Sequence, residues 1–186
     1  MNSTNNKDLY LIDGYALAYR AYYATLKTPL TNSKGQPTGA ILGFVNYLLR
    51  LTKEFKCPYI AVVMDSPAKT FRHELFAEYK ANRTAMPDEM KSQMPFIFRI
   101  VEAFNLTMLQ QCGMEADDII AHCTLSAVEQ GFNVWLVTKD KDLMQLIGPN
   151  VRMLAPETGG KLDVYGPDEV KKKMGVYPEQ IRDCLL

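Results

Sequence analysis

The sequence has no long hydrophobic run and no excess of charge of either sign. Its apolar runs are only a few residues long, which excludes a membrane span of about 20 residues. Residues 1–8 are mostly polar, and the first apolar stretch is too short for a signal peptide. Lys and Arg total 21 and Asp and Glu total 21, so net charge alone does not favour nucleic acid as a ligand. We therefore expect a cytoplasmic protein with no membrane partner.

Histidine and cysteine are scarce, which limits the kinds of metal site that the chain can build. There are two histidines, and the four cysteines lack any C-x-x-C spacing. Zinc sites and disulfide scaffolds need closer or denser arrangements. We expect the cysteines to be reduced thiols and zinc to be a poor fit. Apolar residues make up 47% of the chain and charged residues 23%, which is typical of a folded domain.

Short runs of aliphatic and β-branched residues alternate with longer stretches that have helical periodicity. Strands are expected at residues 9–12, 59–64, 106–109, 134–137 and 151–154. Helices are expected over about residues 41–55, over about 87–104, from about 115 onward, and after Pro167 and Pro178. Pro95 should kink or split the helix at 87–104. This order predicts that residues 1–186 form one α/β domain, a three-layer sandwich around a mostly parallel central sheet.

Acidic residues follow four of the predicted strands, at the point where each strand ends. Together they make up seven of the 21 acids in the chain. They are Asp13 after the first strand, Asp65 after the second, Glu115, Asp117 and Asp118 after the third, and Asp140 and Asp142 after the fourth. Because the carboxyl ends of parallel strands meet at one edge of a sheet, we expect these side chains to share one cleft.

Carboxylates crowded into one cleft cannot all ionise unaided, because like charges and burial both raise their pKa values. Divalent cations resolve this conflict, and hard oxygen ligands suit Mg²⁺ or Mn²⁺. Two such ions about 4 Å apart activate a water and stabilise the leaving oxygen of a phosphodiester. Each acid taken singly is also compatible with a helix cap or a turn, but four strand ends that all finish in acids favour a metal cluster.

The segment at residues 66–86 follows the second predicted strand and is about 20 residues long, a length at which loops are usually functional or mobile. It carries more basic than acidic side chains, namely Lys69, Arg72, Lys80 and Arg83 against Glu74 and Glu78. A net positive segment beside an acidic cleft suits a phosphate held over metal ions, since Arg grips phosphate through two bonds and Lys through its charge. A solvated helix face with paired charges is the alternative interpretation.

Four of the ten tyrosines lie on a helix expected after Asp13, together with Arg20. These are Tyr15, Tyr19, Tyr22 and Tyr23. Aromatic rings beside a phosphate site stack on unpaired bases. A helix also needs an apolar stripe, so core packing is expected for at least two of these rings.

Many of these residues fall in short motifs that extend over nearly the whole chain. The motifs are Leu-Ile-Asp-Gly at 11–14, Ala-Tyr-Arg at 18–20, Phe-Arg-His-Glu at 71–74, Tyr-Lys-Ala-Asn-Arg at 79–83, Gly-Met-Glu-Ala-Asp-Asp at 113–118 and Thr-Lys-Asp-Lys-Asp-Leu at 138–143. In this order they resemble the 5′-nuclease domain at the N-terminus of bacterial DNA polymerase I, within the flap-endonuclease group of PIN-like folds. The resemblance implies a resolvase-like fold and a bacterial, cytoplasmic, metal-dependent 5′-3′ exonuclease. Its implied substrates are DNA with a 5′ flap or a nick, and RNA primers on DNA.

The resemblance also implies roles for single residues. Asp13, Asp65, Glu115 and Asp117 correspond to ligands of a first metal ion, with Asp118 close by, and Asp140 and Asp142 correspond to ligands of a second. Lys80 and Arg83 resemble the catalytic residues of an arch, here residues 66–86, that address the scissile phosphate. The nucleic-acid contacts also include Tyr79, Arg20, Arg72, Tyr19 and Tyr22.

The chain stops at Leu186 inside an apolar helical pattern, so we expect a domain that is cut short. In the family, a Gly-Asp-x-Ser-Asp-Asn-x-Pro-Gly motif and a helix-hairpin-helix element follow, supply a further acid and grip the duplex. Neither these elements nor the polymerase domain, the partner on the same polypeptide in the full-length protein, is present in the sequence. Weak activity is therefore expected. The alternatives are a non-catalytic DNA-binding fragment and a PIN-type ribonuclease, although the basic segment favours the flap group.

Overall fold

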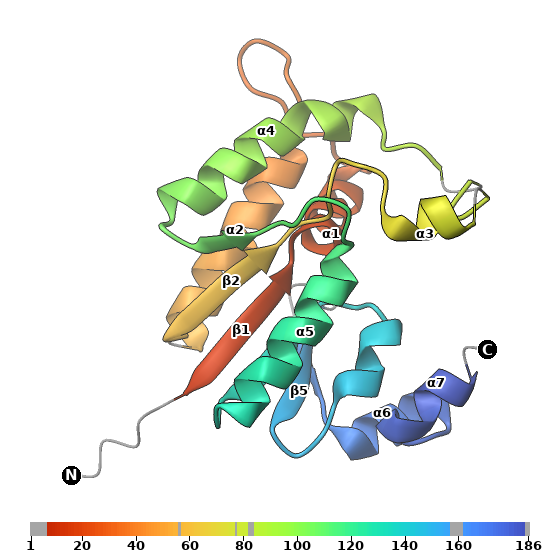
Figure 1. Ribbon diagram of the computed structural model, residues 1–186. Helices are drawn as coiled ribbons and strands as arrows, with labels where there is room; N and C mark the ends of the chain where they lie inside the picture. The colour runs from red at the N-terminus through yellow and green to blue at the C-terminus, as the bar shows by residue number, and fades with distance from the viewer. Residues whose placement is uncertain (1–6, 56, 77, 82–83, 157–161, 185–186) are drawn as a thin grey trace.

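The computed structural model describes residues 7–184 except residues 56, 77, 82–83 and 157–161. Its centre is a six-stranded sheet with the strand order β3-β2-β1-β4-β5-β6. Figure 1 shows β1 and β2 side by side in this sheet. The strands are β1 Asp8–Asp13, β2 Tyr59–Val63, β3 Thr107–Leu109, β4 Asn133–Val137, β5 Val151–Pro156 and β6 Leu162–Tyr165. All neighbouring pairs are parallel except β5 and β6, which are antiparallel. The expected α/β fold with a mostly parallel sheet is confirmed.

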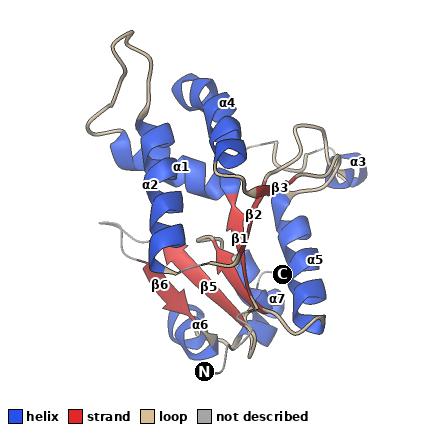
Figure 2. Cartoon of the chain, turned by 90° about the vertical axis from the view of Figure 1, so that its left-hand side faces the viewer, coloured by secondary structure: helices blue, strands red, loops and turns tan. Residues whose placement is uncertain are grey.

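Helices cover both faces of the sheet and make it the middle of three layers (Figure 2). One face carries α1 Gly14–Thr25, α2 Gly39–Glu54 and α4 Asp88–Ala103. The other carries α5 Ala116–Glu129, the 3-10 helices η1 Asp142–Leu146 and η3 Pro178–Gln180, α6 Pro167–Met174 and α7 Ile181–Cys184. A short helix, α3 Phe71–Leu75, lies apart from both layers (Figure 1). In the described ranges, no helix has the length and apolar character needed to span a bilayer.

β1 explains why the central strands appear in the sequence as continuous apolar runs. Tyr10 and Ile12 point into the core beneath α1, α2 and α4, whereas Leu11 points into the core on the other face, and all three are almost fully buried. A central parallel strand is covered on both faces, so polar residues cannot alternate along it. Polar residues are confined to its ends, and Asp13 is the last residue of the strand.

α4 is one continuous helix through Pro95, so of the two expected outcomes, a kink or a split, the split does not occur. A proline inside a helix removes one backbone hydrogen bond and crowds the preceding turn. Along the same helix, Met90, Met94, Ile97 and Val101 are buried against the core. This continuous buried face stabilises the helix through tertiary packing, which outweighs the local preference of one residue.

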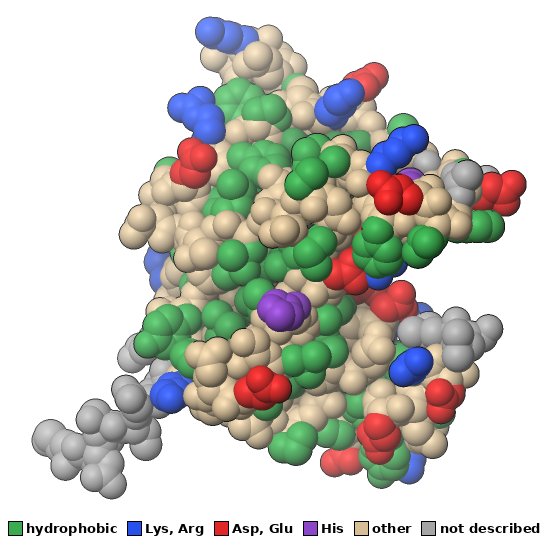
Figure 3. All heavy atoms as spheres, in the orientation of Figure 1, with side chains coloured by type: hydrophobic (Ala, Val, Ile, Leu, Met, Phe, Trp, Pro, Cys, Tyr) green, Lys and Arg blue, Asp and Glu red, His purple; other side chains and the backbone are tan. Residues whose placement is uncertain are grey.

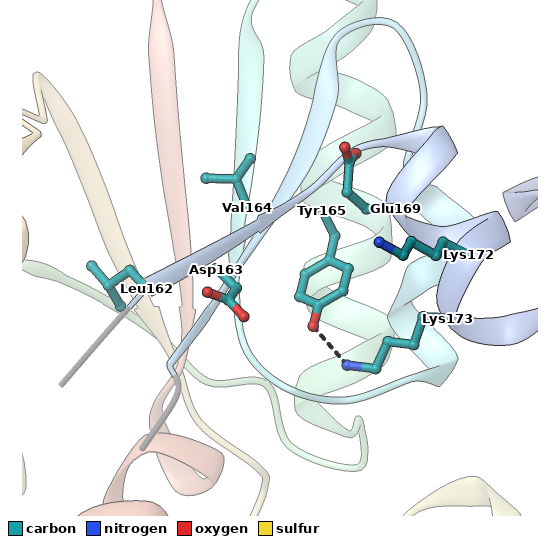
Figure 4. A pocket seen from close by; sticks show the side chains of 7 residues that line it. All are labelled: Leu162, Asp163, Val164, Tyr165, Glu169, Lys172 and Lys173. Atoms are coloured by element: carbon teal, nitrogen blue, oxygen red, sulfur yellow. Dashed lines mark hydrogen bonds between the residues drawn. The ribbon is translucent and has the colours of Figure 1, made fainter. Parts of the chain in front are cut away.

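β6 is the strand at the far edge of the sheet, next to α6, and the sequence pattern does not predict it. β6 is the last strand of the sheet and pairs with β5, and its Asp163 and Val164 are exposed. A pocket lies between β6 and α6 (Figure 4), where Lys173 donates a hydrogen bond to the hydroxyl of Tyr165 over 2.9 Å. Elsewhere in the chain, the four cysteines are free thiols, as expected.

Candidate active site

The ends of β1 and β2 hold two of the predicted acids in fixed positions. Asp13 ends β1 and caps α1, because its Oδ1 accepts the N–H of Ala16 over 2.9 Å. Asp65 follows β2, and its Oδ1 accepts the N–H of Ala116, the first residue of α5, over 2.8 Å. The first N–H groups of a helix have no partner within the helix, so each carboxylate satisfies one of them. The strand ends and helix starts therefore bring both side chains to the same edge of the sheet.

Thr138 connects the ends of β1 and β4. Its hydroxyl donates to Oδ2 of Asp13 over 3.2 Å and accepts the N–H of Asp140 over 3.1 Å. The side chain is only 2% exposed, so these two bonds satisfy a buried polar group. Sequence reasoning missed Thr138, although a polar residue directly after the apolar run of a buried strand is a usable signal.

Asp13 and Asp117 have the pKa values of a crowded, buried acidic site. The pKa of Asp13 is raised to about 6, mainly by burial and also by the charges of Asp65 and Asp140. The pKa of Asp117 is raised to about 7 by burial, and then by the charges of Asp140, Asp13 and Asp65. Both shifts mean that the ionised form is disfavoured. Four carboxylates from four separate segments therefore act on one another at this edge.

The basic segment lies against the acids at the start of α5. Nη1 and Nη2 of Arg72 donate to the two carboxylate oxygens of Asp118 over 2.6 and 2.7 Å, and this contact lowers the pKa of Asp118. Nζ of Lys80 lies 3.0 Å from Oε1 of Glu115, and the hydroxyl of Tyr79 donates to Oε2 over 3.1 Å. Glu115 is 7% exposed, so these partners offset the cost of burying its charge.

A cavity of about 290 Å³ lies where the basic segment meets the end of β2 and the start of α5. Its lining residues are Asp65, Ser66, Ala68, Thr70, His73, Lys80, Met114 and Glu115. Figure 3 shows acidic and basic side chains next to each other in a hollow below the α3 region. Carboxylates and an ammonium group therefore face the same cavity, which suits an anionic ligand held partly through cations.

The aromatic residues of α1 divide between the core and the surface. Tyr22 is 8% exposed and belongs to the core beneath α1, α2 and α4. This burial agrees with the core packing expected for some of these tyrosines, and the contact of Tyr22 with nucleic acid stays a prediction. Tyr19 is half-buried, with its ring centroid 6.2 Å from that of Tyr23. Tyr19 and the half-buried Arg20 remain predicted contacts.

The carboxylates do not form a closed metal-binding set. Within the described residues, no three Asp, Glu, His or Cys side chains are arranged to hold a metal ion together. Both oxygens of Glu115 contact residues of the basic segment, and Asp142 is exposed at the start of η1. Arg83 lies outside the described residues. The donors at the sheet edge are nevertheless all carboxylates, a chemistry that fits Mg²⁺ or Mn²⁺.

Fold and site together define a class of protein, an α/β domain whose sheet carries an acidic cleft at its carboxyl edge, opposite a basic segment. This chain belongs to the family of 5′-3′ exonuclease N-terminal, resolvase-like domains, which it matches over residues 8–175. The match includes all of the acids discussed above. It confirms the family indicated by the order of the sequence motifs.

Relatives and solved structures agree with this assignment. A 5′-3′ exonuclease of Aquifex aeolicus is 40% identical over 179 residues, which are 96% of this chain and 60% of that protein. A DNA polymerase I of Pseudomonas aeruginosa is 44% identical over 177 residues, which are 95% of this chain and 19% of that protein. The chain therefore spans less than two thirds of the length of either relative.

Two solved structures of bacteriophage T5 proteins share the fold. The T5 5′-exonuclease with divalent zinc ions bound has a TM-score of 0.73 and 21% identity, over 93% of this chain and 63% of that one. A T5 flap endonuclease in complex with DNA and metal ions has a TM-score of 0.65 and 23% identity, with the same coverage of 93% and 63%. At this level of identity the comparison establishes the common fold.

Proposed function

We propose that this chain is the catalytic part of a metal-dependent 5′-3′ exonuclease and flap endonuclease, a hydrolase of DNA phosphodiesters. The proposal depends on one observation above all. Asp13, Asp65, Asp117 and Asp140 converge on one edge of the sheet, where burial and, after it, the charges of these neighbours raise the pKa values of Asp13 and Asp117. The relatives named 5′-3′ exonuclease and DNA polymerase I support this chemistry over others that an acidic cleft allows.

The proposed substrates are DNA with a 5′ flap or a nick, and RNA primers paired with DNA. A T5 flap endonuclease of the same fold has been solved with DNA. In this chain, Arg72 and Lys80 place positive charge beside the acids, where a strand would bring its phosphates. Because the chain matches 19% of a DNA polymerase I, a polymerase domain of the same polypeptide is the proposed partner.

We propose that two Mg²⁺ or Mn²⁺ ions bind at this edge, because the donors there are all carboxylates. The first would be held by Asp13, Asp65, Glu115 and Asp117, with Asp118 nearby, and the second by Asp140 and Asp142. When bound, such ions activate a water and stabilise the leaving oxygen of a phosphodiester. The raised pKa values of Asp13 and Asp117 support this fit. Burial raises them most and the charges of neighbouring carboxylates raise them further, and a bound cation would favour the ionised forms.

The protein groups around the acids have separate tasks in this proposal. Thr138 fixes the orientation of the Asp13 carboxylate by donating to Oδ2. Lys80 is 34% exposed at its side chain and lies at the rim of the cavity, so its ammonium group can contact a phosphate while it stays near Glu115. Arg83 is proposed to act with Lys80 on the scissile phosphate.

Cleavage of a 5′-labelled flapped DNA tests the proposal, with Mg²⁺, Mn²⁺ and a chelator in parallel reactions. We expect cleavage with either ion and none with the chelator. Asp13→Asn and Asp117→Asn should each lower the rate by more than about tenfold, because each removes a charged ligand from the cleft. Asp163→Asn is the matched control, since Asp163 is exposed on β6 and outside the acid cavity.

The alternatives give different outcomes in the same assay. Faster cleavage of single-stranded RNA than of flapped DNA would favour a PIN-type ribonuclease. Binding of flapped DNA without cleavage under any metal condition would identify a non-catalytic DNA-binding fragment.

A further inference from the structure

His73 lines the acid cavity but has no part in the chemistry proposed above. Its Nδ1 accepts the backbone N–H of Thr70 over 3.2 Å, and the Thr70 hydroxyl lies 3.0 Å from the same nitrogen. A backbone N–H only donates, so Nδ1 carries no hydrogen and the neutral ring has its hydrogen on Nε2. The acceptor side of the ring is therefore occupied, and Nε2–H is left as a donor.

Ser66 lines the same cavity, and its hydroxyl also accepts backbone N–H groups and keeps a hydrogen to donate. Its Oγ accepts the N–H of Ala68 over 3.1 Å and the N–H of Gly113 over 3.2 Å. These two bonds use both lone pairs of the hydroxyl, and its hydrogen is left to donate. Among the residues that the structure describes, neither Nε2–H of His73 nor Oγ–H of Ser66 has an acceptor.

The surroundings hold both donors in place. Thr70, the partner of His73, is 5% exposed, and the ring of Tyr79 meets the His73 ring at 89° with the centroids 5.4 Å apart. Gly113, a partner of Ser66, has a φ of 78°, a left-handed conformation that glycine adopts without strain. The donors are therefore fixed before a ligand arrives, which lowers the entropy cost of binding.

We propose that His73 and Ser66 form a phosphate-binding subsite beside the acids. His73 donates from Nε2 and Ser66 from Oγ to non-bridging oxygens of a phosphodiester in the bound strand. The subsite rests on the proposed nuclease function, because a nucleic-acid strand supplies the phosphate. Neutral donors suit this position, since a further cation would pair with the neighbouring carboxylates, as Lys80 does with Glu115.

Binding of fluorescent flapped DNA tests the subsite, measured by anisotropy with Ca²⁺ over a range of salt concentrations. His73→Asn should weaken binding by about three- to tenfold, the effect of one lost neutral hydrogen bond. Ser66→Ala should weaken binding at least as much, because it also removes the acceptor of the N–H groups of Ala68 and Gly113. The slope of log K against log salt should not change in either variant, because neutral donors release no counterions. Lys80→Ala should instead lower the slope by about 1.

A comparison of two His73 variants separates the phosphate contact from the bond to Thr70. Asn can accept the N–H of Thr70 but has no donor at the position of Nε2. Gln can place an amide donor near Nε2 but loses the acceptor at Nδ1. A phosphate contact predicts that His73→Gln binds DNA more tightly than His73→Asn. His122→Asn and Ser92→Ala, at exposed positions on α5 and α4, are matched controls that should bind as the unmodified chain does.

The outcomes separate failure of the subsite from failure of the proposed function. If His73→Asn and Ser66→Ala bind as tightly as the unmodified chain, the subsite is wrong and the nuclease proposal is unaffected. A changed salt slope in both variants would mean that they displace Lys80, which also overturns the subsite. If the unmodified chain neither binds nor cleaves flapped DNA, the proposed function fails and the subsite fails with it.

Discussion

Asp13 and Asp117 sit in surroundings that disfavour their charged forms. Their pKa values are about 6 and about 7, against an ordinary value of 3.8. Between about pH 4 and pH 7 the folded chain therefore binds more protons than the unfolded chain, so the free energy of unfolding falls as the pH rises. Asp118 acts in the opposite direction, because Arg72 lowers its pKa. The contribution of Asp118 to the free energy of unfolding is present above about pH 4. It is lost as the pH falls through the pKa that Asp118 has in the folded chain.

The metal-free protein should therefore lose stability between pH 5 and pH 8. We expect the free energy of unfolding to fall by about 1–2 kcal/mol over this range, a figure reduced for the solvent screening of the half-buried Asp117. Asp117→Asn should flatten this dependence and raise the unfolding midpoint at pH 8, because the amide has no charge to repel its neighbours. Urea unfolding with a chelator measures both effects, and Asp163→Asn should behave as the unmodified chain. A pH dependence that survives Asp117→Asn in full would contradict this assignment.

At the scale of elements, the ion pair of Arg72 is the main contact between α3 and α5. α3 has no buried residue, whereas Arg72 makes a two-bond ion pair with Asp118 on α5. Arg72→Ala should lower the free energy of unfolding by about 1–2 kcal/mol, because it removes two charge-assisted bonds from a half-buried pair. Hydrogen exchange in α3 should become faster.

Arg50→Ala is the control for the loss of Arg72, because it breaks an exposed ion pair with Glu54 within α2. It should change the free energy of unfolding by about 0.5 kcal/mol or less. An equal loss in the two variants would show that α3 does not depend on the contact with Asp118.

α1 and α2 approach each other closely at Gly43. A Cβ atom built there would lie 2.7 Å from Cβ of Ala21 and 3.2 Å from its Cα. Gly43→Ala gains about 1 kcal/mol in helix propensity. Its Cβ would nevertheless meet the Cβ and main-chain atoms of Ala21, which no side-chain rotation can move away, and overpacking costs about 1–3 kcal/mol. We expect a net loss of stability in urea unfolding. Gly148→Ala should cost little, since its Cβ would meet nothing within 4 Å, and a stabilised Gly43→Ala would contradict the close packing.

The predictable elements are those whose burial is visible in local patterns. β1, β2 and β4 are predictable because both faces of the sheet are covered and the strands appear as apolar runs. β6 is not, since Asp163 and Val164 are exposed and the strand exists through its pairing with β5. α3 spans five residues with none buried, so it has no periodicity to detect.

The candidate site also has one part that can be predicted from the sequence and one part that cannot. The acids are predictable because their positions follow from strand ends and from the parallel order of the sheet. The bonds from Lys80 and Tyr79 to Glu115 are not, since they depend on the path of residues 66–86, which no local pattern fixes. The burial of Tyr22 likewise depends on how α1 packs against the core.

At the scale of the whole molecule, the net charge is zero, but the charges are not evenly spread over the structure. Asp13, Asp65, Asp117 and Asp140 repel one another at the carboxyl edge of the sheet. This repulsion opposes folding in the absence of a cation, because an unfolded chain separates the same charges. A divalent ion bound there, as proposed, would make the net interaction among these carboxylates attractive.

Mg²⁺ or Mn²⁺ should therefore stabilise the folded chain, and more strongly at pH 8 than at pH 5.5. An ion at 100 times its Kd raises the free energy of unfolding by about 2.7 kcal/mol, which corresponds to a rise in Tm of about 5–10 °C for a domain of this size. At pH 5.5 the shift should be less than about half as large, since protons compete for Asp13 and Asp117, with pKa values of about 6 and 7.

Differential scanning calorimetry with metal or with chelator measures this shift at each pH. Asp117→Asn should reduce both the shift and its pH dependence, because it removes one proposed ligand and one competing proton. Asp163→Asn, at the far edge of the sheet, should keep both. Equal shifts at pH 5.5 and pH 8, or a full shift in Asp117→Asn, would mean that the stabilising cation binds somewhere other than the acids at the ends of β1, β2 and β4.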